Sequence, residues 1–352
     1  MRFAGAVLAG LAGLAAYSGL AACSGRSQVP VGSRIGPALA AAMASADESR
    51  EPWRCAAPDG PSMADETVTV GGHTWQLGAR VMKLGGSSTS SGGGTTTTSG
   101  SSTTTTSDGG GAIAIGVIAD AAGSAPETLA ALGRLRAKLA HVDLVISLGG
   151  MGATRAELDA TIAAITDRAE WPLVALPGDL EPVPAQSAAI AAARQRGTAV
   201  IDGRLVQRIE LSSATIALVP GAGAASRLVA GTDGCIHRTA DVAAAFADLT
   251  PRPGLRILAS TEAPRLSEGD EPAGELAMTA GAGQQIDIAL HGPTSGAATP
   301  ARSGRRDGAA VPLTPGSSDA TPRLPGPRRS STAGILTLQG SAWTWTPIVD
   351  IQ

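Results

Sequence analysis

Aromatic and charged residues are scarce in this sequence. Only 2% of its 352 residues are aromatic and 16% are charged, while 43% are hydrophobic. Lysine occurs only at Lys83 and Lys138, and the formal net charge is −3. This balance excludes nucleic-acid binding driven by neutralisation of phosphates. The mean hydropathy of +0.13 excludes a disordered acidic chain, and the length suits one large domain or two ordinary ones.

Familiar catalytic motifs are also missing. The sequence has no G-x-S-x-G elbow, no P-loop and no intact G-x-G-x-x-G after its first buried strand, so nothing indicates a serine hydrolase, a P-loop enzyme or a Rossmann enzyme. The glycines of 221–223 are interpreted as a turn. The four histidines lack the spacing of metal ligands; they are His73, His141, His237 and His291.

The first 22 residues have the pattern of an export signal. Arg2 precedes an uncharged, largely apolar stretch at 3–20, and Leu20-Ala21-Ala22-Cys23 resembles a bacterial lipobox. We therefore predict a signal peptide at 1–22 and a lipid-modified Cys23 that holds the mature chain on a membrane. The alternative is an ordinary signal peptide followed by an incidental cysteine. Ser24 is not the Asp that signals inner-membrane retention, so resemblance to Gram-negative lipoproteins favours the outer membrane of a bacterial envelope.

The cysteine count agrees with export. The chain has three cysteines, Cys23, Cys55 and Cys235, so lipid on the first would leave one pair in an oxidising compartment. We predict a disulfide between Cys55 and Cys235, which would also remove Cys235 as a partner for catalysis with His237. The alternative is two separate buried thiols.

Composition divides the mature chain into segments. A small, polar tether or arm is expected at 23–65, and alternating apolar residues around Gly71-Gly72 predict a β-hairpin at 66–84. The stretch 85–111 is almost purely Gly, Ser and Thr, which predicts a disordered insertion. The main domain should cover 112–352, with a long Pro/Gly/Arg-rich loop at 297–332.

Buried strands and helices alternate from residue 112 onward. Continuous apolar runs, typical of strands buried on both faces, occur at 112–119, 142–148 and 171–176. Helical patterns lie at 126–141, 155–169 and 185–196. This order predicts an α/β domain with site-forming loops at the carboxyl ends of the strands. Because the second half is richer in short strands, we expect two mixed sheets face to face with helices outside.

Short polar blocks end five of these strands. They read A-D-A-A (119–122), L-G-G-M (148–151), P-G-D-L-E (177–181), L-A-S-T-E-A-P (258–264) and D-I-A-L-H-G-P-T-S (287–295). Their order and hydrophobic framing resemble the calcineurin-like metallophosphoesterases, across 112–348. That resemblance implies an αββα sandwich of two mixed sheets flanked by helices. The family holds two metals with blocks that read D-x-H, G-D-x-x-D, G-N-H-D or G-N-H-E, a lone His and G-H-x-H.

Most ligand positions of that family are replaced in this chain. The resemblance implies vestigial metal positions at Asp120 and Asp179, while other key positions hold Ala122, Met151, Leu180, Thr261, Pro293 and Ser295. Two carboxylates are too few for two transition metals, so we expect no catalytic residues, no metal site and no cofactor. An active form would need a dinuclear divalent metal centre. Asp179 and Glu181 are interpreted as an acid pair on a solvated turn.

Three functional hypotheses follow. The first is a pseudoenzyme: a lipid-anchored, catalytically inactive protein that acts as a binding or scaffold module in the envelope. The second is a divergent metal-dependent phosphoesterase that recruits an altered set from Asp120, Asp179, Glu181, Glu262 or His291. The third is an unrelated α/β surface protein. The sequence predicts the membrane as a partner, reached through Cys23, and identifies no protein or ligand partner.

Overall fold

The structure is a computed structural model that describes residues 50–85, 111–121, 123–249, 253–264, 286–293, 298–305, 310–318 and 331–350. All of these belong to one compact unit, Arg50–Gln352. The predicted signal peptide, Cys23 and nearly all of the Gly/Ser/Thr insertion lie outside the described residues. Within them, no helix is long and apolar enough to cross a membrane.

One sheet contains the predicted alternation of strands and helices. In the described part of the chain its seven strands lie in the order β14 (Arg302–Arg305), β17 (Ala342–Asp350), β16 (Ser331–Gln339), β5 (Ile113–Ile118), β6 (Leu144–Leu148), β7 (Leu173–Leu176) and β8 (Val200–Asp202). Strands β5 to β8 are parallel neighbours, and β16 pairs antiparallel with β5 and β17. The connecting helices are α2 (Pro126–Lys138), α3 (Arg155–Thr166) and α4 (Val183–Gln195).

The second sheet is also mixed. Its eight described strands lie in the order β15 (Val311–Leu313), β13 (Ile288–His291), β12 (Leu255–Ser260), β10 (Ala214–Val219), β9 (Arg208–Glu210), β4 (Val81–Leu84), β3 (His73–Gly78) and β2 (Glu66–Val70). Strands β10, β12, β13 and β15 are parallel, and β9 pairs antiparallel with β10. Helix α5 (Thr239–Leu249) lies between β10 and β12 in the sequence, after a connecting segment that follows β10.

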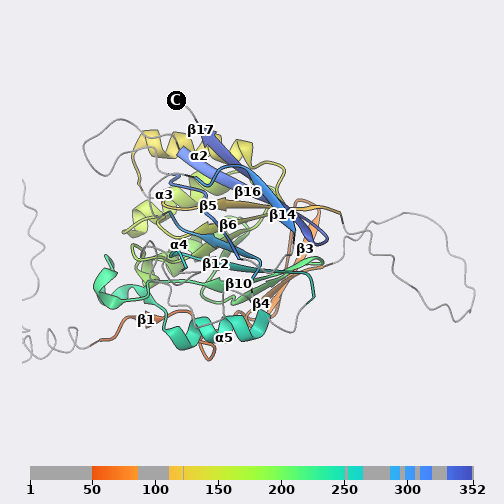
Figure 1. Ribbon diagram of the computed structural model, residues 1–352. Coiled ribbons are helices and arrows are strands. Elements are labelled where there is room, and N and C mark those ends of the chain that lie inside the picture. Colours follow the sequence, from red (N-terminus) through yellow and green to blue (C-terminus); the bar gives the residue numbers. More distant parts are fainter. Residues whose placement is uncertain are drawn as a thin grey trace, which may run out of the picture. The chain divides into compact units, whose positions relative to one another are not determined.

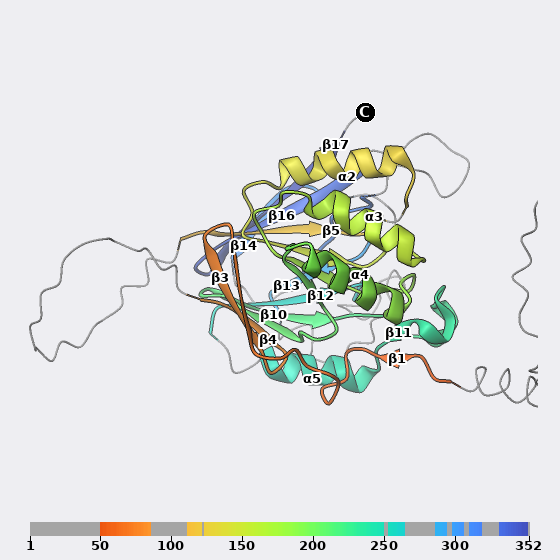
Figure 2. The same ribbon diagram turned by 180° about the vertical axis from the view of Figure 1, so that it is seen from behind.

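The two sheets pack face to face, and helices cover both outer faces (Figures 1 and 2). The core between the sheets includes Trp75, Ile115, Ile216 and Trp345, all fully buried. A second core lies under α2, α3 and α4, and a third lies between α5 and the eight-stranded sheet. The predicted fold class is therefore confirmed. Stacked sheets are the arrangement expected under the first two functional hypotheses, and they disfavour the third, an unrelated α/β surface protein.

The N-terminal strands are part of the second sheet. Gly71 and Gly72 form the β2–β3 turn with φ of +57° and +79°, a left-handed conformation that glycine adopts without strain. The next strand, β4, pairs parallel with β9. Residues 66–84 thus contain a hairpin, β2–β3, as predicted, and through β4 this hairpin continues the sheet of the main domain. Pairing with β9 across a long stretch of sequence explains why local patterning did not reveal this.

Two short strands also occur where the sequence analysis expects only a long loop. Strand β14 pairs with β17, and β15 pairs with β13. Both lie at sheet edges, and each contains a residue type that does not favour strands, Gly304 in β14 and Pro312 in β15. Their conformation is therefore determined by the neighbouring strand and not by their own sequence.

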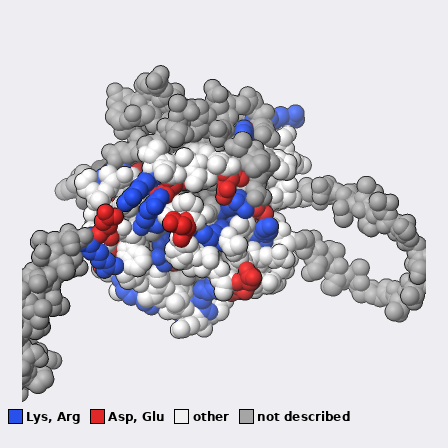
Figure 3. Space-filling model, turned by 90° about the horizontal axis from the view of Figure 1, so that it is seen from below, with Lys and Arg blue, Asp and Glu red and all other residues white. Residues whose placement is uncertain are grey.

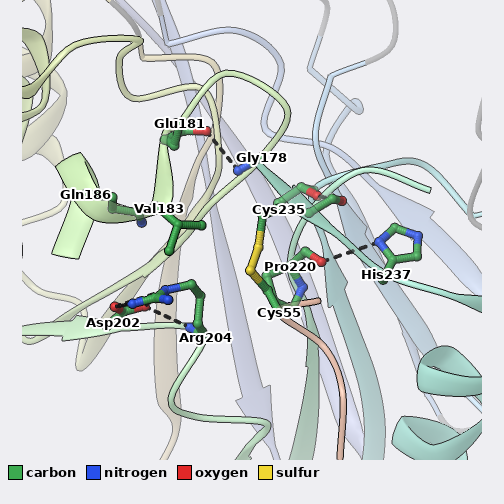
Figure 4. The surroundings of a disulfide bond; sticks show 12 residues. Cys55, Gly178, Glu181, Val183, Gln186, Asp202, Arg204, Pro220, Cys235 and His237 are labelled. Carbon is green, nitrogen blue, oxygen red and sulfur yellow. Dashed lines mark hydrogen bonds and ion pairs between the residues drawn. A yellow bond between two sulfur atoms is a disulfide. The ribbon is translucent and has the colours of Figure 1, made fainter. Parts of the chain in front are cut away.

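A disulfide fastens the N-terminal arm to the domain. Cys55 is bonded to Cys235, which is the predicted pairing, with a Cα–Cα distance of 5.7 Å (Figure 4). Strand β1 (Trp53–Arg54) pairs parallel with β11 (Cys235–Ile236) beside it. Arg54 also binds the buried carboxylate of Asp241 through two hydrogen bonds. The arm from Arg50 onward is therefore an integral part of the domain surface.

Candidate functional site at the strand ends

The carboxyl ends of β5, β6 and β7 bring three loops into backbone contact. Asp120, after β5, donates its N–H to the carbonyl of Gly149 at 3.0 Å. A Cβ at Gly150 would lie 2.7 Å from the Cα of Asp120, and a Cβ at Gly149 would lie 2.9 Å from the Cα of Gly178. Both glycines have positive φ, +83° at Gly149 and +73° at Gly150. Only glycine permits loops to approach this closely.

A buried carboxyl group joins two of these loops. Glu181 has no exposed surface, and one of its oxygens accepts the N–H group of Gly178, after β7 (Figure 4). The other oxygen accepts the N–H group of Met151, after β6. Burial raises the pKa of Glu181 to about 7, although both hydrogen bonds act in the opposite direction. The expectation of a solvated acid pair is therefore wrong for Glu181. Its signal in the sequence was its position after a strand-end glycine, which alone does not distinguish a buried acid from an exposed one.

The two predicted vestigial positions have different surroundings. The carboxylate of Asp120 accepts a hydrogen bond from the hydroxyl of Ser317 at 2.9 Å. Asp120 has a φ of +50°, which is the left-handed backbone region. Asp179 is exposed, and its carbonyl accepts the N–H of Val229 at 2.9 Å. One aspartate thus faces the loop after β15, while the other belongs to the surface beside residues 225–233.

Threonine stands where the family has its lone histidine. The hydroxyl of Thr261 donates to the carbonyl of Gly221 at 2.6 Å, which joins the ends of β12 and β10. A Cβ at Gly292 would lie only 2.3 Å from the carbonyl oxygen of Thr261, so the end of β13 is equally close. Thr261 therefore connects three strand ends through hydrogen bonding and packing.

A histidine and a glutamate approach each other at the same strand ends. Nε2 of His237 lies 4.0 Å from Oε2 of Glu262, while Oε1 of Glu262 pairs with Arg227 at 2.8 Å. Nδ1 of His237 lies 3.3 Å from the carbonyl of Pro220 (Figure 4), and a carbonyl can only accept, so Nδ1 carries the proton. Burial lowers the pKa of His237. Sequence reasoning set this histidine aside, and only the fold brings it to Glu262.

The side chains at these strand ends do not fit a dinuclear metal centre. Such a centre needs several ligands and a bridging carboxylate, but the position to which the resemblance assigns that carboxylate holds the fully buried Met151. Nδ1 of His291 lies 2.8 Å from the carbonyl of Gly292, and burial lowers the pKa of this histidine. Ala122 and Ser295 lie outside the described residues. Within the described ranges, no group of three or more His, Cys, Asp or Glu is placed to hold a metal ion.

A surface cavity of about 630 Å³ lies elsewhere, between β2 and the last turns of α3 and α4. The ion pair between Arg194 and Glu66 forms part of its wall. None of the strand-end residues described above contributes to its lining. The cavity therefore belongs to the edges of the two sheets and not to the candidate site.

Comparison with known proteins found similar chains among solved structures and in neither of the two sequence comparisons. No protein-family model and no curated protein sequence matches the chain. Among solved structures, a metallophosphoesterase from Sphaerobacter thermophilus is 15% identical, with a TM-score of 0.31, covering 68% of this chain and 88% of its own. Purple acid phosphatase PPD1 from yellow lupin seeds is 11% identical, with a TM-score of 0.41, and the match covers 65% of this chain and 49% of the phosphatase. TT1561 of Thermus thermophilus is 12% identical, with a TM-score of 0.43, and the match covers 64% of this chain and 94% of TT1561.

The resemblance inferred from the strand-end blocks concerns the fold. The described domain has two stacked mixed sheets with helices outside, which is the arrangement that this resemblance implies. At the identities given above, the comparisons carry no information on substrate or partner.

Proposed function

We propose that this protein is a lipid-anchored protein of the bacterial cell envelope whose metallophosphoesterase-like domain is catalytically inactive and serves as a binding or scaffold module. The observation that carries this proposal is the chemistry at the strand ends. Met151 offers a buried thioether, Thr261 turns its hydroxyl to a carbonyl, and Glu181 accepts two backbone N–H groups. A metal-bound hydroxide forms at neutral pH only where the metal is held tightly.

Metal content and hydrolysis test the inactive domain. The mature protein, dialysed against Mn²⁺, Fe²⁺ or Zn²⁺ and then against buffer, should retain far less than one metal ion per chain. It should hydrolyse p-nitrophenyl phosphate and bis-p-nitrophenyl phosphate no faster than the buffer. The double variant Asp120→Ala with Asp179→Ala serves as the control for contaminating phosphatase. Metal-dependent turnover that disappears in this variant would establish the divergent phosphoesterase instead.

The lipid anchor has its own test. The lipobox-like sequence before Cys23 supports it, as does the disulfide, which fits an oxidising compartment. Cys23→Ser should abolish incorporation of a fatty-acid analogue and leave an unprocessed precursor, while the neighbouring Ser24→Ala should be labelled normally. Separation of inner and outer membranes then tests the proposed outer-membrane location. Normal labelling and processing of Cys23→Ser would contradict the anchor.

A further inference from the structure

Exposed apolar side chains occur where the arm enters the domain. Trp53 is 40% exposed and Val229 is 66% exposed. They lie on adjoining segments, since the N–H of Trp53 donates to the carbonyl of Gly234 at 2.9 Å, just after the 3-10 helix Gly231–Asp233. Arg50 pairs with Asp233 at 3.3 Å and lies 5.4 Å from the centre of the Trp53 ring. We call Arg50, Trp53 and Val229 the entry rim.

The entry rim lies on the same side of the domain as the strand ends. The carbonyl of Asp179, in the loop after β7, accepts the N–H of Val229, and β11 forms a bridge with Ala222, just after β10. Figure 2 shows β1 and β11 on the side toward which the arrows of β5 and β10 point. A surface that contacted the rim would therefore face the strand-end loops.

Charges around the rim are balanced. Arg50 pairs with Asp233, and two further pairs follow, Arg238 with Glu51 at 3.2 Å and Arg227 with Glu262 at 2.8 Å. Figure 3 shows basic and acidic side chains interleaved on the α5 side of the molecule. Paired arginines do not select an anionic partner, while an exposed indole and an exposed aliphatic side chain on adjoining segments suit the polar–apolar boundary of a lipid bilayer.

The sequence that precedes the described residues indicates which partner the entry rim can meet. Residues 1–49 precede the rim, and a lipid on Cys23 would leave residues 23–49 between the bilayer and Arg50. A flexible chain of this length reaches roughly 30 Å on average, so an anchor on Cys23 would keep the domain close to the bilayer. The anchor thus gives the bilayer a high effective concentration near Trp53, so the bilayer is the apolar surface that Trp53 meets most often.

On the basis of the proposed lipid anchor, we infer that the entry rim rests on the zwitterionic headgroup region of that bilayer. Trp53 and Val229 supply the apolar contact, and the strand-end loops consequently face the membrane. The contact between the entry rim and the bilayer should be weak by itself. It should form nevertheless, because the lipid anchor already holds the protein on the same bilayer.

Tryptophan fluorescence provides a direct test, because Trp53 is the one tryptophan that lipid can reach. The other four are buried, with exposed fractions of 0% for Trp75, 2% for Trp171, 4% for Trp343 and 0% for Trp345. Lipidated protein in vesicles of brominated phosphatidylcholine should lose part of its emission relative to vesicles of ordinary phosphatidylcholine. Trp53→Phe should abolish that loss, and 0.5 M salt should leave it unchanged.

Two valines provide a matched comparison. Val229→Ser should reduce the quenching at least twofold, whereas Val349→Ser, at a 44% exposed position on β17, should not alter it. Protein that sediments with the vesicles through Cys23 but shows no Trp53-dependent quenching would overturn the inference and leave the anchor intact. Quenching that requires anionic lipid and vanishes in salt would also overturn it. Failure to sediment at all would contradict the proposed anchor instead.

Discussion

The buried carboxyl of Glu181 should make the stability of this domain depend on pH. Its pKa is raised from 4.5 to about 7, mainly because it is buried, with a smaller contribution from the charge of Asp179. Between these two values the folded state binds more protons than the unfolded state. Stability from this group is therefore complete below pH 4.5 and is lost as the pH rises through 7. At about 1.4 kcal/mol per pH unit, the loss amounts to about 3 kcal/mol.

The substitution Glu181→Gln isolates this effect. Glutamine does not titrate and offers one acceptor oxygen where Glu181 offers two, so one of the N–H groups of Met151 and Gly178 loses its partner. We expect the variant to be less stable than the wild type at pH 5, by about 1–3 kcal/mol. As the pH rises to 8, the difference in unfolding free energy between the two proteins should shrink by about 3 kcal/mol, so that it approaches zero or changes sign.

Urea unfolding of both proteins at pH 5, 6, 7 and 8 measures this difference. The difference is needed because the lowered pKa values of His237 and His291 act with the opposite sign and mask the effect in the wild type alone. Glu127→Gln, at an exposed position in the first turn of α2, is the control and should keep a constant offset. A Glu181→Gln offset that is equally constant from pH 5 to 8 would refute the reasoning.

Three further predictions concern stability. Gly150→Ala should destabilise far more than Gly72→Ala, because both have positive φ but only Gly150 has backbone within 3 Å of the added Cβ; chemical denaturation compares them, and equal losses would contradict the close loop contact. Reduction of the disulfide between Cys55 and Cys235 should lower the free energy of unfolding by about 2–5 kcal/mol, measured with and without dithiothreitol, and an unchanged midpoint would contradict it. Thr261→Val should cost about 1–3 kcal/mol, since it leaves a backbone carbonyl without its donor; a neutral substitution in thermal unfolding would count against that bond.

Much of the fold could be predicted because its strands are long apolar runs. Residues 144–148 and 173–176 are buried at every position, so they read as interior parallel strands without any partner being known. The alternation with helices then leaves few possible arrangements. The edge strands β14 and β15 were missed for the opposite reason, since their residues carry no pattern of their own.

The site could be predicted less well, because its contacts join residues that are far apart in sequence. The position of Glu262 beside His237 depends on β12 and β11 ending together. The contact of Asp120 with Ser317 joins residues that are 197 positions apart. Strand-end blocks reveal which side chains are present, whereas burial decides whether a carboxyl such as Glu181 is a ligand, an acid or a structural bridge.

A carboxylate at position 151, where the resemblance implies a bridging ligand, should therefore not create a metal site. Met151 is fully buried within the apolar cluster that includes Ile118, Leu158 and Ile162, and its N–H is bound by Glu181. Met151→Asp would place a carboxyl group in this cluster, close to the carboxyl group of Glu181. Burial and like charge would disfavour ionisation of both groups. We expect a loss of about 3 kcal/mol or more in urea unfolding, and no gain in Zn²⁺ binding by calorimetry. Met151→Leu, which conserves the volume, should cost less than about 1.5 kcal/mol. A stable Met151→Asp variant that binds Zn²⁺ stoichiometrically would show instead that the strand ends retain a site lacking only its bridging carboxylate.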